Sequence, residues 1–143
     1  MKKIPYNKQY VDNNDLKSIT KAASQEFITT GKSVTTFQNS VSNFLKSKYV
    51  LSCSSGTTAL HLALKAISLK KGDIVIMPSV NFIAAYSMCD LSGAKIFLTD
   101  VDPFTGQMRP KDLLDCINKN KIKKIKAVFV MYLGGYPENI IEF

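Results

Sequence analysis

Four adjacent residues, Ser55-Gly56-Thr57-Thr58, have the types and spacing to bind an anion. They stand where a helical pattern begins, and the first turn of a helix offers backbone N–H groups without acceptors and the positive end of the helix dipole. Gly56 lets an anion approach the backbone closely, and the neighbouring hydroxyl groups add donors. The pattern indicates phosphate binding, but serine and threonine are also common helix caps, so the four residues alone leave both interpretations open.

Other residues that could do chemistry are better explained by local structure. Gly31-Lys32-Ser33 resembles the end of a P-loop, but Glu26 stands where that motif needs glycine, and a helical pattern rather than a strand precedes it. Asp100 and Asp102 follow an apolar run and could form a carboxylate pair or bind a metal. A nearby proline and glycine favour a turn instead. His61 lies within an apolar helical pattern, which predicts a buried, hydrogen-bonded imidazole.

Composition excludes several classes of protein. The chain has 143 residues, 45% of them apolar and 21% charged, as in ordinary globular proteins. Its formal charge of +8 is the balance of 19 basic and 11 acidic residues, and Arg109 is the single arginine among the basic ones. Because arginine is favoured for reading bases and clamping phosphates, this bias argues against a nucleic-acid partner. We expect a solvated rim at the lysine-rich segment 119–126.

Cysteine usage and the absence of apolar signals indicate the compartment. The three cysteines have neither metal-site nor disulfide spacing, so we expect free, buried thiols and no metal site. The chain shows neither a signal peptide nor an apolar run long enough to cross a membrane. The sequence therefore predicts a cytoplasmic protein without a membrane partner.

The elements that must position these residues alternate along the chain. Apolar residues at helical spacing predict helices over 14–27, 34–45, 57–67 and 81–91. Two further helices are predicted to begin at Pro110 and at Glu138. Short apolar runs predict strands at 49–53, 74–77, 96–98 and 127–132. Helices of this length between uniformly apolar strands indicate an α/β fold, with a mostly parallel sheet covered by helices on both faces.

Taken in order, these segments resemble the DegT/DnrJ/StrS sugar aminotransferases, which are pyridoxal-phosphate (PLP) enzymes of fold type I. The most specific match is YVLSCSSGTTALHLAL, residues 49–64. Looser matches occur, with natural spacing, at residues 4–6, 28–34 with Phe37, 72–79, 81–84, 93–94 and 100–102. The resemblance implies the N-terminal part of the family's three-layer α/β/α large domain. It divides the chain into an N-terminal helical segment, 1–47, and an incomplete PLP-binding domain, 48–143.

The resemblance also implies the roles of particular residues. Gly56 and Thr57, with Ser55 and Thr58 nearby, would hold the cofactor phosphate. Phe82 matches the aromatic residue that stacks on the pyridine ring, although packing on a helix face would also explain an aromatic residue there.

Substrate contacts are implied less specifically. Tyr6 and the Thr30-Gly31 turn would line the entrance for a nucleotide-linked sugar. The chain departs from the family pattern at Met131-Tyr132-Leu133, where the family often has histidine.

The activity implied for the parent protein is transfer of an amino group from L-glutamate to a nucleotide-linked keto-deoxysugar, in surface polysaccharide biosynthesis and by a homodimer. The family's Schiff-base lysine and the acidic partner of its pyridine nitrogen match no residue here. We therefore expect them beyond residue 143 and expect the 143-residue chain alone to be an inactive, N-terminal fragment. A sugar 3-dehydratase of the same family, or an inactive fragment or binding module, stays open.

Overall fold

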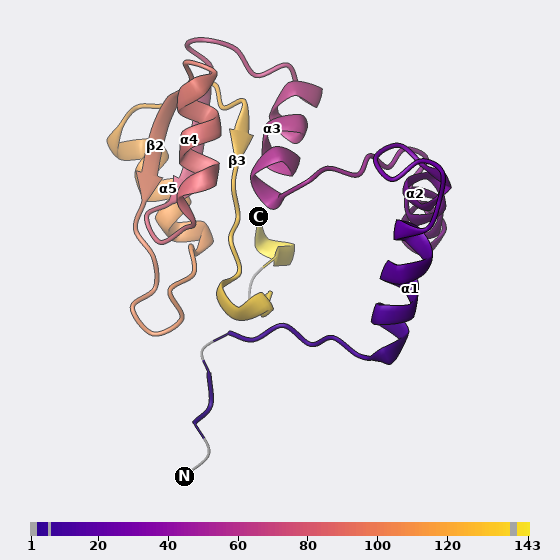
Figure 1. Ribbon diagram of the computed structural model, residues 1–143. Coiled ribbons are helices and arrows are strands. Elements are labelled where there is room, and N and C mark those ends of the chain that lie inside the picture. Colours follow the sequence, from indigo (N-terminus) through magenta and orange to yellow (C-terminus); the bar gives the residue numbers. More distant parts are fainter. Residues whose placement is uncertain (1–2, 6, 138–139) are drawn as a thin grey trace. The chain divides into compact units, whose positions relative to one another are not determined.

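The computed structural model describes residues 3–5, 7–137 and 140–143 and separates the chain into two compact units, Met1–Ser52 and Cys53–Phe143 (Figure 1). The predicted division into a helical segment, 1–47, and a PLP-binding domain, 48–143, stays a prediction.

The first unit contains two helices, α1 (Asn13–Ala23) and α2 (Lys32–Leu45). Asp12 caps α1 by accepting hydrogen bonds from the N–H groups of Asn14 and Asp15 at 2.7 and 3.0 Å. The prediction that this helix continues to residue 27 is wrong. It ends at Ala23, where both the N–H and the hydroxyl of Ser24 bond to the carbonyl of Thr20 and close the last turn.

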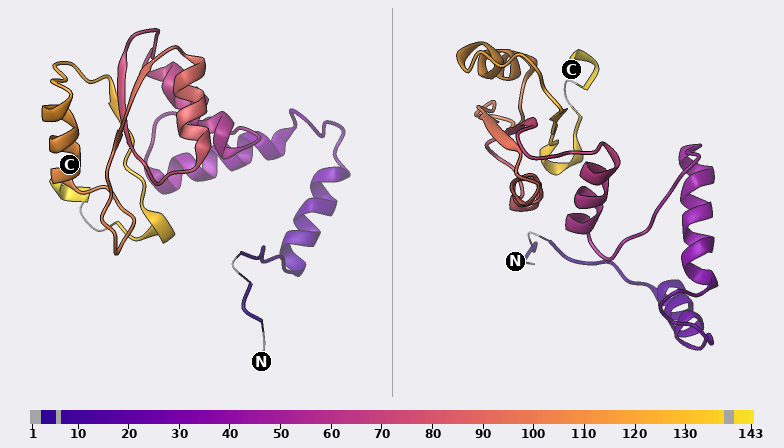
Figure 2. Two further views of the ribbon diagram at one scale, coloured as in Figure 1. Left: turned by 90° about the vertical axis from the view of Figure 1, so that its left-hand side faces the viewer. Right: turned by 90° about the horizontal axis from the view of Figure 1, so that it is seen from above.

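The second unit is built on three parallel strands, β1 (Ile74–Pro78), β2 (Lys95–Thr99) and β3 (Ala127–Val128), in the order β2-β1-β3. Helix α4 (Ile83–Leu91) connects β1 to β2, and α5 (Pro110–Lys119) connects β2 to β3. The two crossovers move in opposite directions across the sheet, so right-handed connections place their helices on opposite faces. The left view of Figure 2 shows this arrangement, with α3 (Gly56–Ala66) on the same side as α4. The predicted α/β class and parallel sheet are confirmed.

Strand β1 is the centre of the core. Val75, Ile76 and Met77 are at most 1% exposed, as expected of a uniformly apolar strand between two helical layers. Val75 and Met77 pack with Leu64 of α3 and with the α4 residues Ala85 and Cys89. The core therefore fixes α3 and α4 on one face of the sheet.

Two strand predictions need correction. Residues 49–53 form no strand, and Tyr49 and Leu51 are 79% and 76% exposed, because no strand among the described residues pairs with them. The predicted strand 127–132 is reduced to Ala127–Val128, followed by a hydrogen bond from the Phe129 N–H to the carbonyl of Ile76 at 2.8 Å. Its pairing ends near Pro78, which has no N–H to donate.

Two helix predictions also differ from the structure. The helix predicted from residue 81 begins at Ile83, because Phe82 is its N-cap. Glu138, where a last helix was predicted to begin, lies outside the described residues, and a short 3₁₀ turn covers Ile140–Glu142.

Candidate functional site

The first turns of α3 and α4 lie at the carboxyl edge of the sheet. Helix α4 leaves the end of β1 and therefore begins at this edge. Helix α3 packs against α4, and the chain runs from its C-terminal end into the start of β1, so α3 begins at the same edge (Figure 1). Open α/β sheets bind their ligands at this edge.

The first turn of α3 is capped and still has free donors. The Ser55 hydroxyl accepts a hydrogen bond from the Thr58 N–H at 3.2 Å and lies 2.8 Å from the Thr58 hydroxyl oxygen. The Ala59 N–H bonds to the Ser55 carbonyl at 3.0 Å. Within the part of the chain that the structure describes, the N–H groups of Gly56 and Thr57 have no acceptor. Helix capping and anion binding are therefore compatible here.

Gly56 has open space in front of it. A Cβ built on this residue would meet no atom within 4 Å, and its backbone lies outside the left-handed region that favours glycine. Neither packing nor backbone conformation among the described residues therefore requires glycine at this position. Gly56 and Thr57 are exposed and Thr58 is half-buried. A phosphate group fits this turn, because the space and two backbone donors occur together.

Phe82 lies at the start of α4, at the same edge of the sheet. Its N–H donates to Asn81 Oδ1 at 2.7 Å, and its carbonyl accepts from the Ala85 N–H at 3.3 Å. These bonds fix the backbone, while the residue is 71% exposed. Packing on a helix face therefore does not account for this phenylalanine in the described structure, and its ring is available to a flat ligand.

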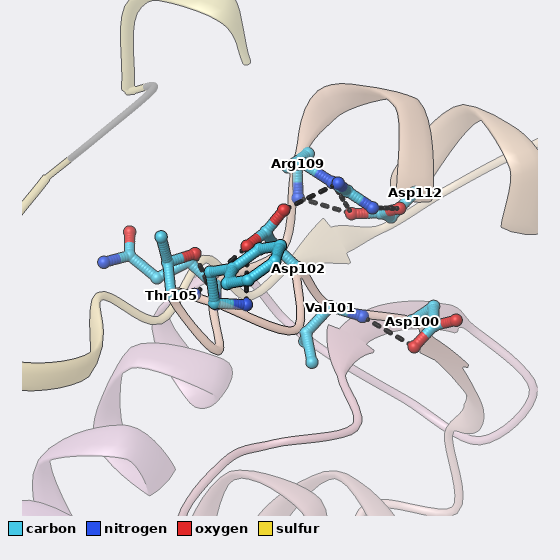
Figure 3. Close-up of polar contacts among 8 residues, drawn as sticks. Asp100, Val101, Asp102, Thr105, Arg109 and Asp112 are labelled. Atoms are coloured by element: carbon cyan, nitrogen blue, oxygen red, sulfur yellow. Dashed lines mark hydrogen bonds and ion pairs between the residues drawn. The ribbon is translucent and has the colours of Figure 1, made fainter.

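The loop after β2 is held by a network of charged groups that Figure 3 shows. Asp102 Oδ1 accepts hydrogen bonds from the N–H groups of Phe104 and Thr105 at 2.9 and 3.1 Å, and its Oδ2 pairs with Arg109 Nη1 at 2.7 Å. Arg109 also binds both carboxylate oxygens of Asp112 at 2.9 Å. The backbone bonds and Arg109 hold the pKa of Asp102 below its usual value. The Arg109 guanidinium likewise lowers the pKa of Asp112.

This network confirms that Asp102 forms a turn, and it assigns a role to Arg109 that sequence reasoning missed. The single arginine in a lysine-rich chain, three residues before Asp112, was the available signal. Gln107 extends the network by donating to the Tyr136 carbonyl at 3.0 Å, which ties the loop to the segment after β3. The loop thereby forms a fixed part of the carboxyl edge.

The predicted substrate residues belong to the first unit. Gly31 is the N-cap of α2, and a Cβ there would overlap the Phe27 carbonyl oxygen, so close packing requires this glycine. Thr30 is exposed, and Tyr6 lies outside the described residues. A substrate role for these three residues stays a prediction.

His61 is half-buried rather than buried. Cys89 and Cys116 are free and buried, and burial raises the pKa of both thiols, whereas Cys53 is exposed, contrary to expectation, because it precedes α3 in an open segment. Across residues 3–5, 7–137 and 140–143, no group of side chains could hold a metal ion, and no helix is long and apolar enough to cross a membrane.

Open α/β domains commonly bind phosphorylated ligands at a helix start at the carboxyl edge of a parallel sheet, and this unit has such an open, donor-rich helix start. The sequence profile of the DegT/DnrJ/EryC1/StrS aminotransferase family matches residues 9–142, and the chain belongs to this family. The resemblance noted from the sequence is thereby confirmed.

Individual relatives agree with this assignment. The chain is 30% identical over 146 residues to a GDP-perosamine synthase from Escherichia coli O157:H7, covering 99% of the chain and 39% of the relative. It is 32% identical over 132 residues to a UDP-4-amino-4,6-dideoxy-N-acetyl-beta-L-altrosamine transaminase from Campylobacter jejuni, covering 92% and 34%. The chain thus spans between a third and two fifths of the length of these relatives.

A solved structure shows the same fold. A GDP-4-keto-6-deoxymannose-3-dehydratase, crystallised with a trapped PLP-glutamate geminal diamine, superimposes with a TM-score of 0.82 over 98% of this chain and 37% of that protein. At 24% identity this likeness concerns the fold alone.

Proposed function

We propose that this chain is the N-terminal, cofactor-binding part of a PLP-dependent aminotransferase. The parent enzyme would move an amino group from L-glutamate to a nucleotide-linked keto-deoxysugar. The observation that carries the proposal is the first turn of α3, where Gly56 leaves open space beside two N–H groups that have no acceptor among the described residues. Membership of the aminotransferase family and relatives named for amino sugars support the substrate class.

In this proposal the residues of the carboxyl edge bind and orient the cofactor. The N–H groups of Gly56 and Thr57 donate to the phosphate, and the Thr57 and Thr58 hydroxyls add donors. Ser55 keeps the turn in place through its bond to the Thr58 N–H. Phe82 packs against the flat ring and limits its contact with water.

When bound, PLP supplies an electron sink that makes transfer of an amino group to a keto group possible. None of the lysines in this chain is assigned as the Schiff-base lysine, which we expect in the sequence after Phe143. We further propose that the parent enzyme is a cytoplasmic homodimer that serves surface-polysaccharide biosynthesis, with Tyr6, Thr30 and Gly31 near the sugar entrance.

The test uses the product of the complete reading frame that contains this chain. The purified protein is incubated with PLP, L-glutamate and either a GDP- or a UDP-linked 4-keto-6-deoxysugar, and the sugar product is analysed by mass spectrometry. We expect the keto oxygen to be replaced by an amino group, with 2-oxoglutarate formed in equal amount.

The same assay separates the alternatives. Loss of the sugar's 3-hydroxyl group without gain of nitrogen identifies a 3-dehydratase instead. A folded protein that binds PLP and changes neither sugar is a binding module or an inactive fragment, and that result refutes the enzymatic proposal.

A further inference from the structure

The fold gathers lysines from distant segments at the amino edge of the sheet, opposite the candidate cofactor site. The C-terminal ends of α3, α4 and α5 and the segments that lead into the three strands all lie at this edge (Figure 1). We call this surface the lysine edge, and its lysines are Lys65, Lys70, Lys71, Lys95, Lys119, Lys121, Lys123, Lys124 and Lys126. All nine are exposed.

Backbone contacts hold these segments together. The Lys126 N–H donates to the Ile74 carbonyl at 2.8 Å, and the Lys95 N–H donates to the Asp73 carbonyl at 2.8 Å. A Cβ built on Gly93 would lie 3.2 Å from Lys71 Cβ, so the segments before β1 and β2 touch. The backbone that carries Lys71, Lys95 and Lys126 is therefore joined along one edge of the sheet.

Few carboxylates on the segments of the lysine edge offset its positive charge. The aspartates on its segments are Asp73 and Asp90, and between Cys116 and Glu138 the chain has no acidic residue. In the described part of the chain, the ion pairs all involve Arg109, which lies at the other edge. Nine lysines thus face solvent without a carboxylate partner among the described residues.

Two exposed apolar side chains belong to helix ends at the same edge of the sheet. Leu91 ends α4 and is 69% exposed, and Ile67 caps the C-terminal end of α3 and is 41% exposed. Lysine beside a helix C-terminus is explained by the helix dipole, but that explanation covers neither the apolar residues nor segment 121–126. Cationic side chains around exposed aliphatic ones are typical of surfaces that bind anionic bilayers.

We propose that the lysine edge binds the surface of a membrane containing anionic phospholipids. The candidate cofactor site of the proposed function would then face away from the bilayer. This revises the expectation that the chain has no membrane partner. The residue types of the lysine edge argue against a nucleic acid or an acidic protein as its partner. The lysine edge has neither arginine for reading bases nor aromatic residues for stacking on them, and lysine is depleted in the cores of protein interfaces.

The experiment measures flotation of the complete reading-frame product with vesicles of phosphatidylcholine alone or mixed with phosphatidylserine. We expect binding to the mixed vesicles only, and loss of binding at about 0.5 M salt, where charges are screened within a few ångströms. Glutamine at Lys119, Lys123, Lys124 and Lys126 should weaken binding at least about tenfold, since each lysine near an anionic surface contributes roughly fivefold.

A matched variant tests whether vesicle binding depends on where the lysines lie or only on the net charge of the protein. Glutamine at Lys8, Lys17, Lys21 and Lys48 of the first unit removes the same charge and should leave vesicle affinity unchanged. Leu91→Gln should weaken vesicle binding without altering charge, and all variants should keep the wild-type Tm.

Three outcomes would overturn the proposal. The first is that the protein shows no preference for phosphatidylserine. The second is that both quadruple variants lose the same affinity, which would mean that net charge alone matters. The third is that the lysine edge binds a single-stranded RNA oligonucleotide more tightly than the vesicles, which would make the partner a nucleic acid.

Discussion

A Gly56→Ala substitution adds one methyl group to the first turn of α3. The structure places no atom within 4 Å of that methyl group, and the backbone of Gly56 suits any L-residue. Folding should therefore tolerate alanine here, and the free energy of unfolding should stay unchanged or rise by up to about 1 kcal/mol, because alanine reduces the freedom of the unfolded chain.

Cofactor binding should respond in the opposite direction. The methyl group would occupy the space beside the Gly56 and Thr57 N–H groups, where we place a phosphate oxygen. A hydrogen bond to a charged group contributes about 1.5–3 kcal/mol, so losing one should weaken PLP binding about 10- to 100-fold.

The assay compares PLP with pyridoxal, which has the same ring and no phosphate. Equilibrium dialysis of the reading-frame product against each compound should show that Gly56→Ala loses PLP affinity and keeps pyridoxal affinity, while thermal denaturation shows an intact fold. Gly72→Ala is the control, because Gly72 lies at the far edge of the sheet with φ +84°. It should destabilise the fold and leave PLP binding unchanged.

Two results would refute the reasoning. If Gly56→Ala binds PLP as tightly as the wild type, the phosphate does not lie at this turn. If Gly56→Ala lowers the stability of the fold, the space in front of Gly56 is not open.

Three further substitutions test the site and its supports. Ser55→Ala removes the acceptor for the Thr58 N–H and should destabilise the protein by about 1 kcal/mol in urea denaturation; an unchanged midpoint would contradict the cap. Phe82→Leu should change stability by less than about 0.5 kcal/mol, because the side chain is largely exposed, yet weaken the binding of PLP and pyridoxal alike. If the variant binds PLP and pyridoxal as tightly as the wild type does, Phe82 is not part of the site. Asp112→Asn should lower stability near neutral pH, because the pKa of Asp112 is lowered by Arg109 in the folded protein. That stabilisation is present above the unfolded-state pKa of about 4 and is lost as pH falls through the lower folded value, so wild type and variant should converge in acid. If the free energies of unfolding of the two proteins differ by the same amount at every pH, the ionised form of Asp112 does not stabilise the fold.

Local patterns made parts of this structure predictable from the sequence. The continuous apolar run of β1 indicated a strand covered on both faces, and Val75 and Ile76 are fully buried. The Ser55–Thr58 turn could also be predicted from a local pattern, because a helix start and its cap lie within a few residues of each other. The family resemblance then implied PLP as the ligand of this turn, which stays a proposal.

Features that depend on distant partners were missed or wrong. Residues 49–53 have the composition of a strand, but a strand needs a neighbour to pair with, and no described segment supplies one. The contact between Asp102 and Arg109 depends on how the loop after β2 folds back, which apolar periodicity does not encode. The lysine edge likewise appears only when the topology brings the starts of three strands together.

The central claim is that the first turn of α3 holds the cofactor phosphate, and a crystal structure of the reading-frame product with PLP tests it most directly. We predict phosphate oxygens about 3 Å from the backbone nitrogens of both Gly56 and Thr57, with the pyridine ring against Phe82. A phosphate group bound elsewhere, with these two N–H groups still facing solvent, would contradict the account.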